Sequence, residues 1–255
     1  MTAPSFAPFV APGPTGRTFR AERRARLGDV GPGGRLRLDA VARYLQDVAN
    51  DDSTDAGLED PLSWVVRRTA IDVHQPAIFN ESLALTTWCA GTGAGWAERR
   101  TSLIGDRGAR IEAAALWVAW DVGTGRPRRL SRQFFDIYGD AAQGRRIRAR
   151  LTHPDPGGDE ETSERPWPLR FTDFDLLRHV NNAAYWSILE EHLSGNAAIR
   201  SGPIRAELEH RQPIEFGDQV EVLPLVDAAT GVVRLWLIVD ADIRATFVAI
   251  SEPPP

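Results

Sequence analysis

Two stretches of the chain place apolar residues at helical spacing. Residues 38–49 and residues 180–189 each repeat apolar side chains at steps of three and four, which predicts two helices that bury one face. Beyond each helix, runs such as 101–121 and 232–250 are apolar or alternate with polar residues, and Gly or Asp turns interrupt them. These runs predict antiparallel strands joined by tight turns, so a helix followed by several strands occurs twice.

The two helix-and-strand units align with each other. A shift of 144 positions places Leu45 on Leu189, and a shift of 137 lays residues 71–85 over 208–222 with Gln-Pro on Gln-Pro. This repeat predicts an α+β protein with two copies of one fold, each a long helix wrapped by a curved antiparallel β-sheet. Two copies can pair their sheets and cover an exposed edge. Chance similarity between two α+β domains is the alternative explanation.

The segment of residues 153–168 separates the two units. It combines Pro, Gly and acidic residues without an apolar face, which is typical of a linker. We therefore predict an N-terminal domain over residues 16–152 and a C-terminal domain over residues 169–255.

Composition narrows the class of protein. The chain has 255 residues, 42% hydrophobic and 25% charged, which fits a globular protein of one or two domains. Its single cysteine excludes an internal disulfide and fits a reducing compartment. The net charge of −5 argues against a nucleic-acid-binding surface. The longest apolar run, residues 113–120, is far shorter than the roughly 20 residues that cross a bilayer, so we expect a cytoplasmic protein without a membrane span.

The second unit carries polar residues at the start of its helix that the first unit lacks. They lie in and beyond the motif DFDLLRHVNNAAYW at residues 173–186. Buried polar groups cost free energy unless structure or function uses them, so we expect the chemistry in the second unit. The first unit is then a scaffold and pocket wall. The repeat aligns five polar residues of the second unit with residues of another type in the first. They are Asp175, His179, Asn181, Asn182 and Glu215, which align with Gly31, Arg35, Arg37, Leu38 and Ile78.

This polar set suits the activation of a carbonyl group. The first N–H groups and the positive dipole end of a helix can polarise a carbonyl oxygen, which is an oxyanion site in outline. Asp175 or Glu215, with His179 as partner, can then activate a water or attack the carbonyl carbon directly. A purely structural role, with an Asn capping the helix and Asp175 closing a turn, explains one Asn and one Asp but not the His between them.

Other short motifs favour structural interpretations. The acidic run of residues 51–55 matches the D-D-x-x-D pattern of magnesium-diphosphate sites, but we expect it to solvate the end of the first helix. The glycines of residues 91–95 precede a predicted strand and not a helix, so they predict a hairpin turn. The sequence has no H-E-x-x-H, C-x-x-C or G-x-S-x-G motif, so we expect neither a metal site nor a serine nucleophile.

Four motifs together resemble one known family. They are RLRLDAVARYLQDVANDD at residues 35–52, SWVVRRTAIDV at 63–73, WAERRTSL at 96–103 and DFDLLRHVNNAAYW at 173–186. From about Phe19 to Ile250 the chain resembles the acyl-acyl carrier protein thioesterases. The resemblance implies a tandem double hot-dog fold and the hydrolysis of fatty acyl thioesters on acyl carrier protein in lipid metabolism, without a metal or organic cofactor.

The resemblance also implies roles for residues of the second unit. The family's catalytic set falls on Asp175, His179 and Glu215. It further implies that the first turn of the second helix holds the developing oxyanion. Whether Asp175 or Glu215 acts as the base stays open at this point.

One position departs from the family pattern. Leu177 stands where plant members have the Asn of D-x-N-x-H, so we expect Asn181 to join the catalytic set and Asn182 to bind substrate. Arg178, where many single-domain relatives have Gly, is the expected contact for the acidic carrier protein. The Arg-rich segment 126–150 is either a second carrier contact or a result of codon preference, since every basic residue of the chain is Arg.

Two other functions stay open. An acyl-coenzyme A thioesterase would bind a nucleotide, for which the sequence displays no site. A non-catalytic acyl-thioester-binding protein would not need the three catalytic groups together. The repeat already supplies the second copy that a single hot-dog domain obtains by dimerising, so a monomer and a homodimer both fit. The preferred acyl chain length depends on pocket depth and stays open.

Overall fold

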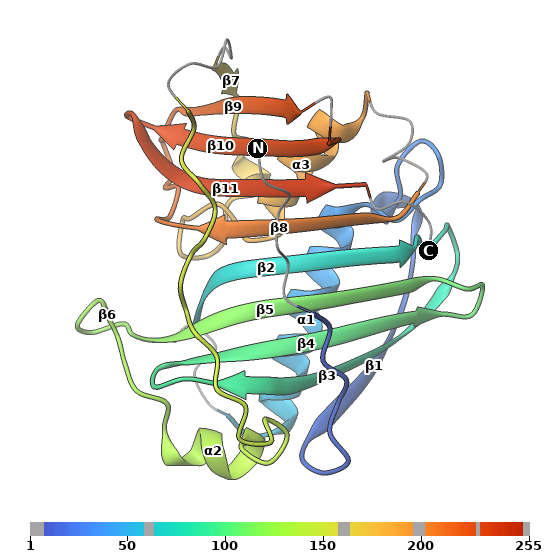
Figure 1. The fold of residues 1–255 in the computed structure, drawn as a ribbon, viewed down its shortest axis with the longest axis vertical. Helices are drawn as coiled ribbons and strands as arrows, with labels where there is room; N and C mark the ends of the chain where they lie inside the picture. Colours follow the sequence, from blue (N-terminus) through green and yellow to red (C-terminus); the bar gives the residue numbers. More distant parts are fainter. Residues whose placement is uncertain (1–7, 59–63, 158–163, 196–201, 228–229, 252–255) are drawn as a thin grey trace.

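The protein is built on one large antiparallel β-sheet with two helices packed against one face (Figure 1). This computed structural model describes residues 8–58, 64–157, 164–195, 202–227 and 230–251. The helices are α1 (Leu38–Asp55), α2 (Arg132–Tyr138) and α3 (Ala184–Leu193). The strands of the first half are β1 (Thr18–Arg24), β2 (Trp64–Gln75), β3 (Ser82–Thr92), β4 (Trp96–Gly105), β5 (Arg110–Asp121) and β6 (Arg126–Pro127). Those of the second half are β7 (Arg165–Trp167), β8 (Ile204–His210), β9 (Val220–Asp227), β10 (Val232–Val239) and β11 (Asp242–Ile250).

The two halves of the sheet repeat one strand order. Across the sheet the order is β1-β3-β4-β5-β2-β8-β11-β10-β9-β7, with β6 beside β5, so β2 and β8 meet in the middle. At this junction Ala70 pairs with Glu207, and these two residues are 137 positions apart. The shift of 137 makes Ala70 and Glu207 equivalent positions of the repeat. Since these two equivalent positions pair with each other, an approximate two-fold axis passes through the junction. The predicted repeat and the α+β fold are confirmed.

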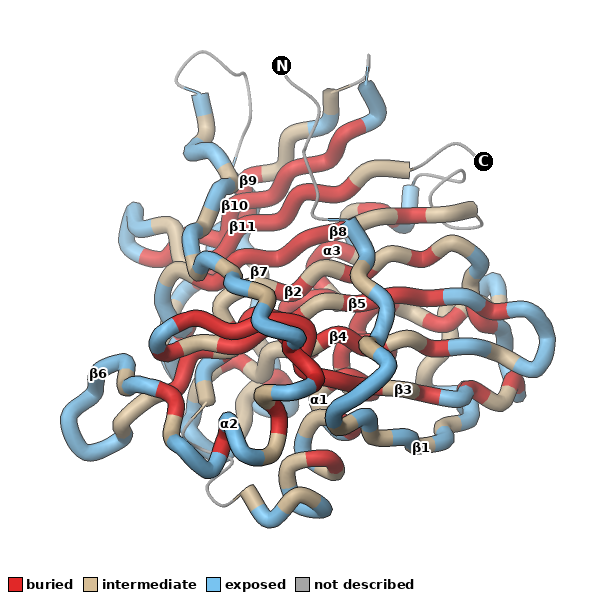
Figure 2. Tube along the Cα trace, turned by 60° about the horizontal axis from the view of Figure 1, so that its bottom comes forward, coloured by how far each residue is buried: buried red, intermediate tan, exposed pale blue. Residues whose placement is uncertain are grey.

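The main core lies between the sheet and the paired helices α1 and α3. Figure 2 colours most residues of this region as buried. Leu38, Val41 and Val48 face this core from α1, as the helical spacing predicted. Fully burying one such side chain stabilises the fold by about 1.5–3 kcal/mol. The second predicted helix begins later than expected. Val180 is extended instead. It forms a bridge with Phe174, and its N–H donates to the carbonyl of Ile214 at 2.9 Å.

The opposite face of the sheet is crossed by the segment of residues 145–157 (Figure 1). The indole N–H of Trp96 donates to the carbonyl of Ile147 at 3.0 Å, and the indole N–H of Trp236 donates to that of Pro154 at 2.9 Å. Part of the predicted linker lies at residues 158–163, outside the described residues, and its residues Arg165–Trp167 form β7 beside β9. The domain boundaries therefore stay a prediction. Among the described helices, none is long and apolar enough to span a membrane.

Candidate active site

A tight loop before α3 carries most of the predicted catalytic residues. The N–H of Asp175 donates to the carbonyl of His179 at 2.9 Å, and the N–H of Arg178 donates to the carbonyl of Asp175 at 3.0 Å. The Oδ1 atom of Asp175 accepts the N–H groups of Leu177 at 2.9 Å and His179 at 3.2 Å. These bonds fix the carboxylate. Its Oδ2 atom accepts no hydrogen bond from the described residues.

The loop contains a residue in a left-handed backbone conformation. Arg178 has φ 63°, and its counterpart in the first half is Gly34 with φ 76°. Such a conformation costs a residue with a side chain roughly 1–2 kcal/mol. The guanidinium of Arg178 lies over the ring of Phe216, 4.9 Å from its centroid, and this contact offsets part of that cost. The predicted carrier contact is thus exposed at the rim of the site.

His179 and Glu215 are brought together by backbone pairing. They form an antiparallel bridge in which Val180 N–H donates to the Ile214 carbonyl at 2.9 Å and Phe216 N–H donates to the Arg178 carbonyl at 3.0 Å. In this type of pair the Cα atoms lie about 4.5 Å apart and the side chains share one face. Asp175, His179 and Glu215 therefore occupy one small antiparallel unit and not separate surfaces.

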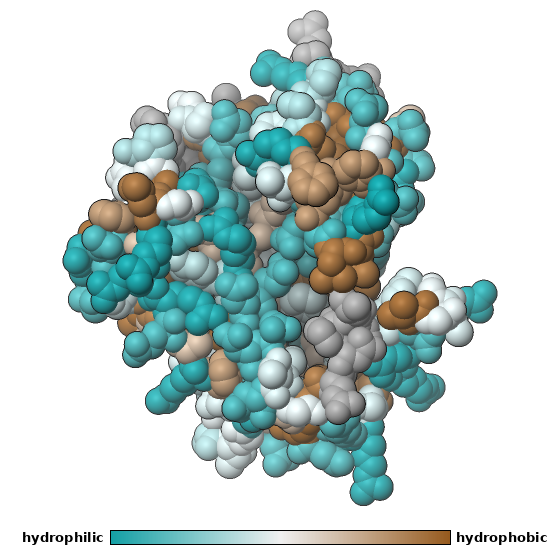
Figure 3. Space-filling view, turned by 180° about the vertical axis from the view of Figure 1, so that it is seen from behind, coloured by the Kyte–Doolittle hydropathy of each residue, from teal (hydrophilic) through white to brown (hydrophobic). Residues whose placement is uncertain are grey.

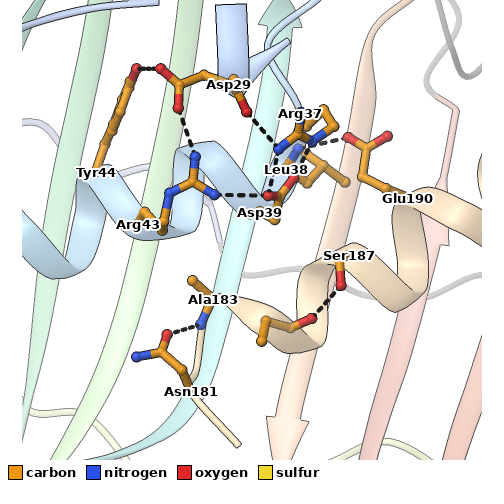
Figure 4. Close-up of polar contacts among 12 residues, drawn as sticks. Asp29, Arg37, Leu38, Asp39, Arg43, Tyr44, Asn181, Ala183, Ser187 and Glu190 are labelled. Atoms are coloured by element: carbon orange, nitrogen blue, oxygen red, sulfur yellow. Dashed lines mark hydrogen bonds and ion pairs between the residues drawn. The ribbon is translucent and has the colours of Figure 1, made fainter. Parts of the chain in front are cut away.

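The two asparagines of the motif have different surroundings. The Oδ1 atom of Asn181 accepts the N–H of Ala183 at 2.9 Å, which closes the turn before α3 (Figure 4). Asn182 lies on a cavity wall. Its backbone N–H and its carboxamide make no hydrogen bond to any residue that the structure describes. Asn182 is therefore the amide available to a ligand.

A cavity of about 680 Å³ joins this loop to the first half of the protein. Its walls come mostly from α1, α2 and the strands β2 to β5, which all belong to the first half. His179, Asn181 and Glu215 lie beside the cavity and not in its wall. The lining includes Gln46, Asn50, Trp64, Cys89, Arg99, Trp117, Phe134, Tyr138, Asp175, Leu176, Leu177 and Asn182.

The far wall of the cavity contains a buried charge cluster. Asp52 is 1% exposed and accepts hydrogen bonds from Arg17 at 2.7 Å, Arg99 at 2.6 Å and Tyr138 at 3.0 Å. The expectation that the acidic run solvates the end of α1 is wrong at this residue, because its partners come from three segments distant in sequence. Burial raises the pKa of the Tyr138 phenol, which therefore stays protonated and donates to Asp52.

Cys89 also lines the cavity, but it is a poor nucleophile. Burial raises the pKa of its thiol above the ordinary value, so at neutral pH the group is a thiol and not a thiolate. Its Sγ atom donates to the carbonyl of Gly91 at 3.6 Å. The cysteine therefore serves as packing in this wall.

In the first half, the position equivalent to the site is filled by side chains. Arg35 stands at the position of His179, and its Nη2 atom lies 2.9 and 2.8 Å from the two carboxylate oxygens of Glu190 in α3. The backbone N–H of Leu38, the first residue of α1, donates to Glu190 Oε1 at 2.6 Å (Figure 4). This closed site was not predicted from the sequence, although a shift of 144 positions places Gln46 on Glu190 and is the signal that points to it.

One group of possible metal ligands lies within the described part of the chain. His153, Glu207 and Glu209 present ligand atoms within 4.8 Å of one another on the face of the sheet opposite to the helices. His153 Nδ1 already bonds Thr246 Oγ1 at 2.8 Å, and Glu209 accepts the N–H groups of Thr152 and His153 at 2.7 and 2.9 Å. These contacts anchor the crossing segment to β8 and β11.

The helix side of the molecule, viewed in Figure 3, carries hydrophobic residues scattered among hydrophilic ones. Several exposed apolar residues belong to the loop and its neighbours. Phe171 is 84% and Leu176 is 78% exposed, and Leu177 and Phe216 are about half exposed. Together with Arg178 they give the rim of the site an apolar surface with a positive charge.

Comparison with known proteins gives two consecutive family matches. The profile described as "Acyl-ACP thioesterase N-terminal domain" matches residues 16–138, and that described as "Acyl-ACP thioesterase C-terminal domain" matches residues 158–242. A Mycobacterium tuberculosis protein whose name assigns no activity is 34% identical over 234 residues, which cover 91% of each chain. The chloroplastic oleoyl-acyl carrier protein thioesterase of Coriandrum sativum is 24% identical over 251 residues, which cover 86% of this chain and 66% of the plant protein.

Solved structures match the fold over most of its length. The 12:0-ACP thioesterase of Umbellularia californica has a TM-score of 0.77 at 19% identity and covers 94% of this chain and 99% of its own. An acyl-ACP thioesterase of Bacteroides thetaiotaomicron has a TM-score of 0.74 at 16% identity and covers 92% of this chain and 98% of its own. At these identities the similarity concerns the fold, which is the predicted tandem hot-dog.

Proposed function

The chain belongs to the acyl-ACP thioesterase family, and from that premise we propose that it hydrolyses fatty acyl thioesters carried on acyl carrier protein. Water adds to the thioester carbonyl carbon, the carbon–sulfur bond breaks, and a free fatty acid and the thiol of the carrier are released. The observation that carries the proposal is one loop that holds Asp175 in the wall of a cavity of about 680 Å³, with the backbone N–H of His179 bonded to the Asp175 carboxylate.

We assign the base to Asp175 on geometric grounds. Its Oδ1 atom is held by two backbone N–H groups, while Oδ2 accepts no hydrogen bond from the described residues and can take the proton of the attacking water. Asp175 lies in the cavity wall, whereas Glu215 lies beside it and is exposed. This division supports Asp175 as the base and Glu215 as the partner of His179.

His179 acts as the general acid in this mechanism. Glu215 shares a face with His179 through the bridge, so its carboxylate orients and stabilises the protonated imidazole. The imidazolium gives its proton to the departing sulfur as the carbon–sulfur bond breaks. The free N–H of Asn182, at the start of α3, stabilises the negative charge that develops on the carbonyl oxygen.

The proposal is tested by thiol release from one acyl chain on acyl carrier protein and on coenzyme A. We expect faster release from the carrier protein, because Arg178 and its apolar neighbours offer a contact for an acidic protein. Asp175→Asn and His179→Ala should each reduce kcat by about 10²–10⁴-fold, since general acid–base catalysis contributes that much. Glu215→Gln should reduce it less, because Glu215 acts through His179.

The outcomes separate the candidate functions. Equal rates for wild type and His179→Ala would remove His179 from the mechanism. Faster release from coenzyme A would favour the acyl-coenzyme A thioesterase. Binding of acyl carrier protein without any thiol release by wild type would identify a non-catalytic binding protein.

A further inference from the structure

The repeat places two equivalent helix starts in one molecule, which allows one to be compared with the other. A shift of 144 positions pairs Leu38 at the start of α1 with Asn182 before α3, and Gln46 with Glu190. The two turns that precede these positions have equivalent backbone hydrogen bonds. Leu36 N–H donates to the Ala77 carbonyl at 2.8 Å, and its counterpart Val180 N–H donates to the Ile214 carbonyl at 2.9 Å.

In the first half this helix start already binds a carboxylate. Glu190 reaches across from α3, and its Oε1 atom accepts the N–H of Leu38 at 2.6 Å (Figure 4). Arg35 holds the same carboxylate, and the two side chains are only 11% and 15% exposed. In the half that lacks catalytic residues, a carboxylate therefore already binds the N–H group of Leu38. The fold itself shows that a negatively charged oxygen fits there.

In the second half the corresponding N–H group is free, and the residue equivalent to Glu190 is neutral. The N–H of Asn182 has no acceptor among the described residues. Gln46 comes across from α1, as Glu190 comes across from α3, and both Gln46 and Asn182 line the cavity. The Oε1 atom of Gln46 is buried and has no hydrogen-bond partner. A buried acceptor without a donor costs free energy, so a ligand that donates a hydrogen bond to it is favoured.

We propose that Gln46 is a catalytic residue of the second-half site, contributed by the half that lacks the acid–base groups. Its Oε1 atom accepts a hydrogen bond from the attacking water and holds that water between Asp175 and the carbonyl carbon. Asp175 removes the other proton of the water as the carbon–oxygen bond forms. The inference rests on the proposed thioester hydrolysis and deepens it.

Three neighbouring residues of the loop do not supply this acceptor. Asn181 uses its Oδ1 atom in the turn before α3, and the loop positions Leu176 and Leu177 are apolar. Gln46 is neutral, so it leaves the N–H of Asn182 to the thioester oxygen. A carboxylate at the same position would occupy that N–H group, as Glu190 does in the first half.

The first test is Gln46→Met, which keeps the length of the side chain and removes its polar atoms. We expect kcat for thiol release from acyl-ACP to fall about 10- to 100-fold while KM changes less than about threefold, because the lost bond orients water and not the acyl chain. Thermal unfolding, measured alongside, should show that the variant is folded. A kcat equal to that of wild type would overturn the proposal.

The second test exchanges the residue types between the equivalent positions. Gln46→Glu should reproduce the closed arrangement of the first half and lower kcat about 100-fold or more, because its carboxylate takes the N–H of Asn182. The matched control is Glu190→Gln. It opens the closed site and should leave kcat within about twofold while lowering the melting temperature, because Arg35 loses its counter-charge.

Failure of this inference differs from failure of the proposed function. If wild type releases no thiol, the hydrolase assignment is wrong and the role of Gln46 as a water acceptor falls with it. If wild type is active and both Gln46 variants match its kcat, only the inference about Gln46 is overturned.

Discussion

At the scale of single residues, hydrogen bonds and burial decide the chemistry that an ionisable side chain can perform. Asp175 has backbone N–H groups on one oxygen, and Cys89 is held as a thiol by burial. His210 at the end of β8 is the strongest case. Its Nε2 atom is buried without a partner, and its ring meets the edge of Tyr185 with the centroids 4.8 Å apart. A protonated imidazole cannot be accommodated there.

His210 makes the stability of the protein depend on pH. Burial, and secondarily the charge of Arg67, lowers the pKa of His210 from 6.5 to about 3. At pH values between these two pKa values, His210 binds a proton in the unfolded chain but not in the folded chain. Stability is therefore full above about pH 6.5 and falls as the pH drops toward 3, by up to about 1.4 kcal/mol per pH unit.

This dependence is measured by urea unfolding between pH 7 and pH 4. His210→Phe keeps a ring against Tyr185 and should flatten the curve relative to wild type. The half-exposed His74, changed to Asn, is the control and should leave the slope unchanged. Parallel curves for wild type and His210→Phe would contradict the assignment.

At the scale of elements, α1 serves both the core and the cavity. One face packs against the sheet with apolar side chains, and its last turn carries Asp52 into the charge cluster with Arg17, Arg99 and Tyr138. The cluster ties α1 to β4, to α2 and to the segment before β1. Because Arg99 and Tyr138 line the cavity, the cluster also fixes the shape of that wall.

Removing the carboxylate from this cluster should destabilise the fold strongly. Asp52→Ala leaves Arg99, which is 14% exposed, without its counter-charge, and breaking a buried pair in this way costs about 3–5 kcal/mol. Tyr138→Phe should cost about 1 kcal/mol, since one hydrogen bond is lost. The control is Asp55→Ala, whose carboxylate is 60% exposed and should contribute no more than about 1 kcal/mol. Equal unfolding free energies for the two alanine variants would contradict this account.

At the scale of the whole molecule, the junction of β2 and β8 makes two copies of one unit into a single sheet. The paired residues at the axis, Ala70 and Glu207, differ in the two copies although their backbones are equivalent. The candidate site depends on this junction, because the loop with Asp175 belongs to one half and most of the cavity wall to the other.

A like charge at the axis should therefore weaken both halves together. Ala70→Glu places a second carboxylate directly opposite Glu207, which is 7% exposed, and like charges in that position are destabilising. We expect a loss of about 1–3 kcal/mol in urea unfolding, in one transition for the whole chain. Ala70→Gln, of the same size without the charge, is the control. Two separate transitions would contradict the view that the junction couples the halves.

Much of this architecture follows from the sequence alone. Helical spacing marked α1, and the shifts of 144 and 137 revealed the repeat that the strand order confirms. The loss of Asp, His and Asn from the first copy pointed to the loop before α3. The helix and the repeat could be predicted because periodicity and repeat spacing are local properties that the chain carries without folding.

Other features were decided only by the tertiary structure. The sequence predicts a catalytic role for Asn181 and substrate binding for Asn182, but folding engages the first in the turn before α3 and places the second in the cavity wall. It placed Asp52 in solvent, and it gave no role to Gln46. Each of these residues takes its surroundings from segments far away in the chain, across the sheet junction or between the two helices. Such contacts depend on how distant elements pack, and no spacing along the chain encodes that directly.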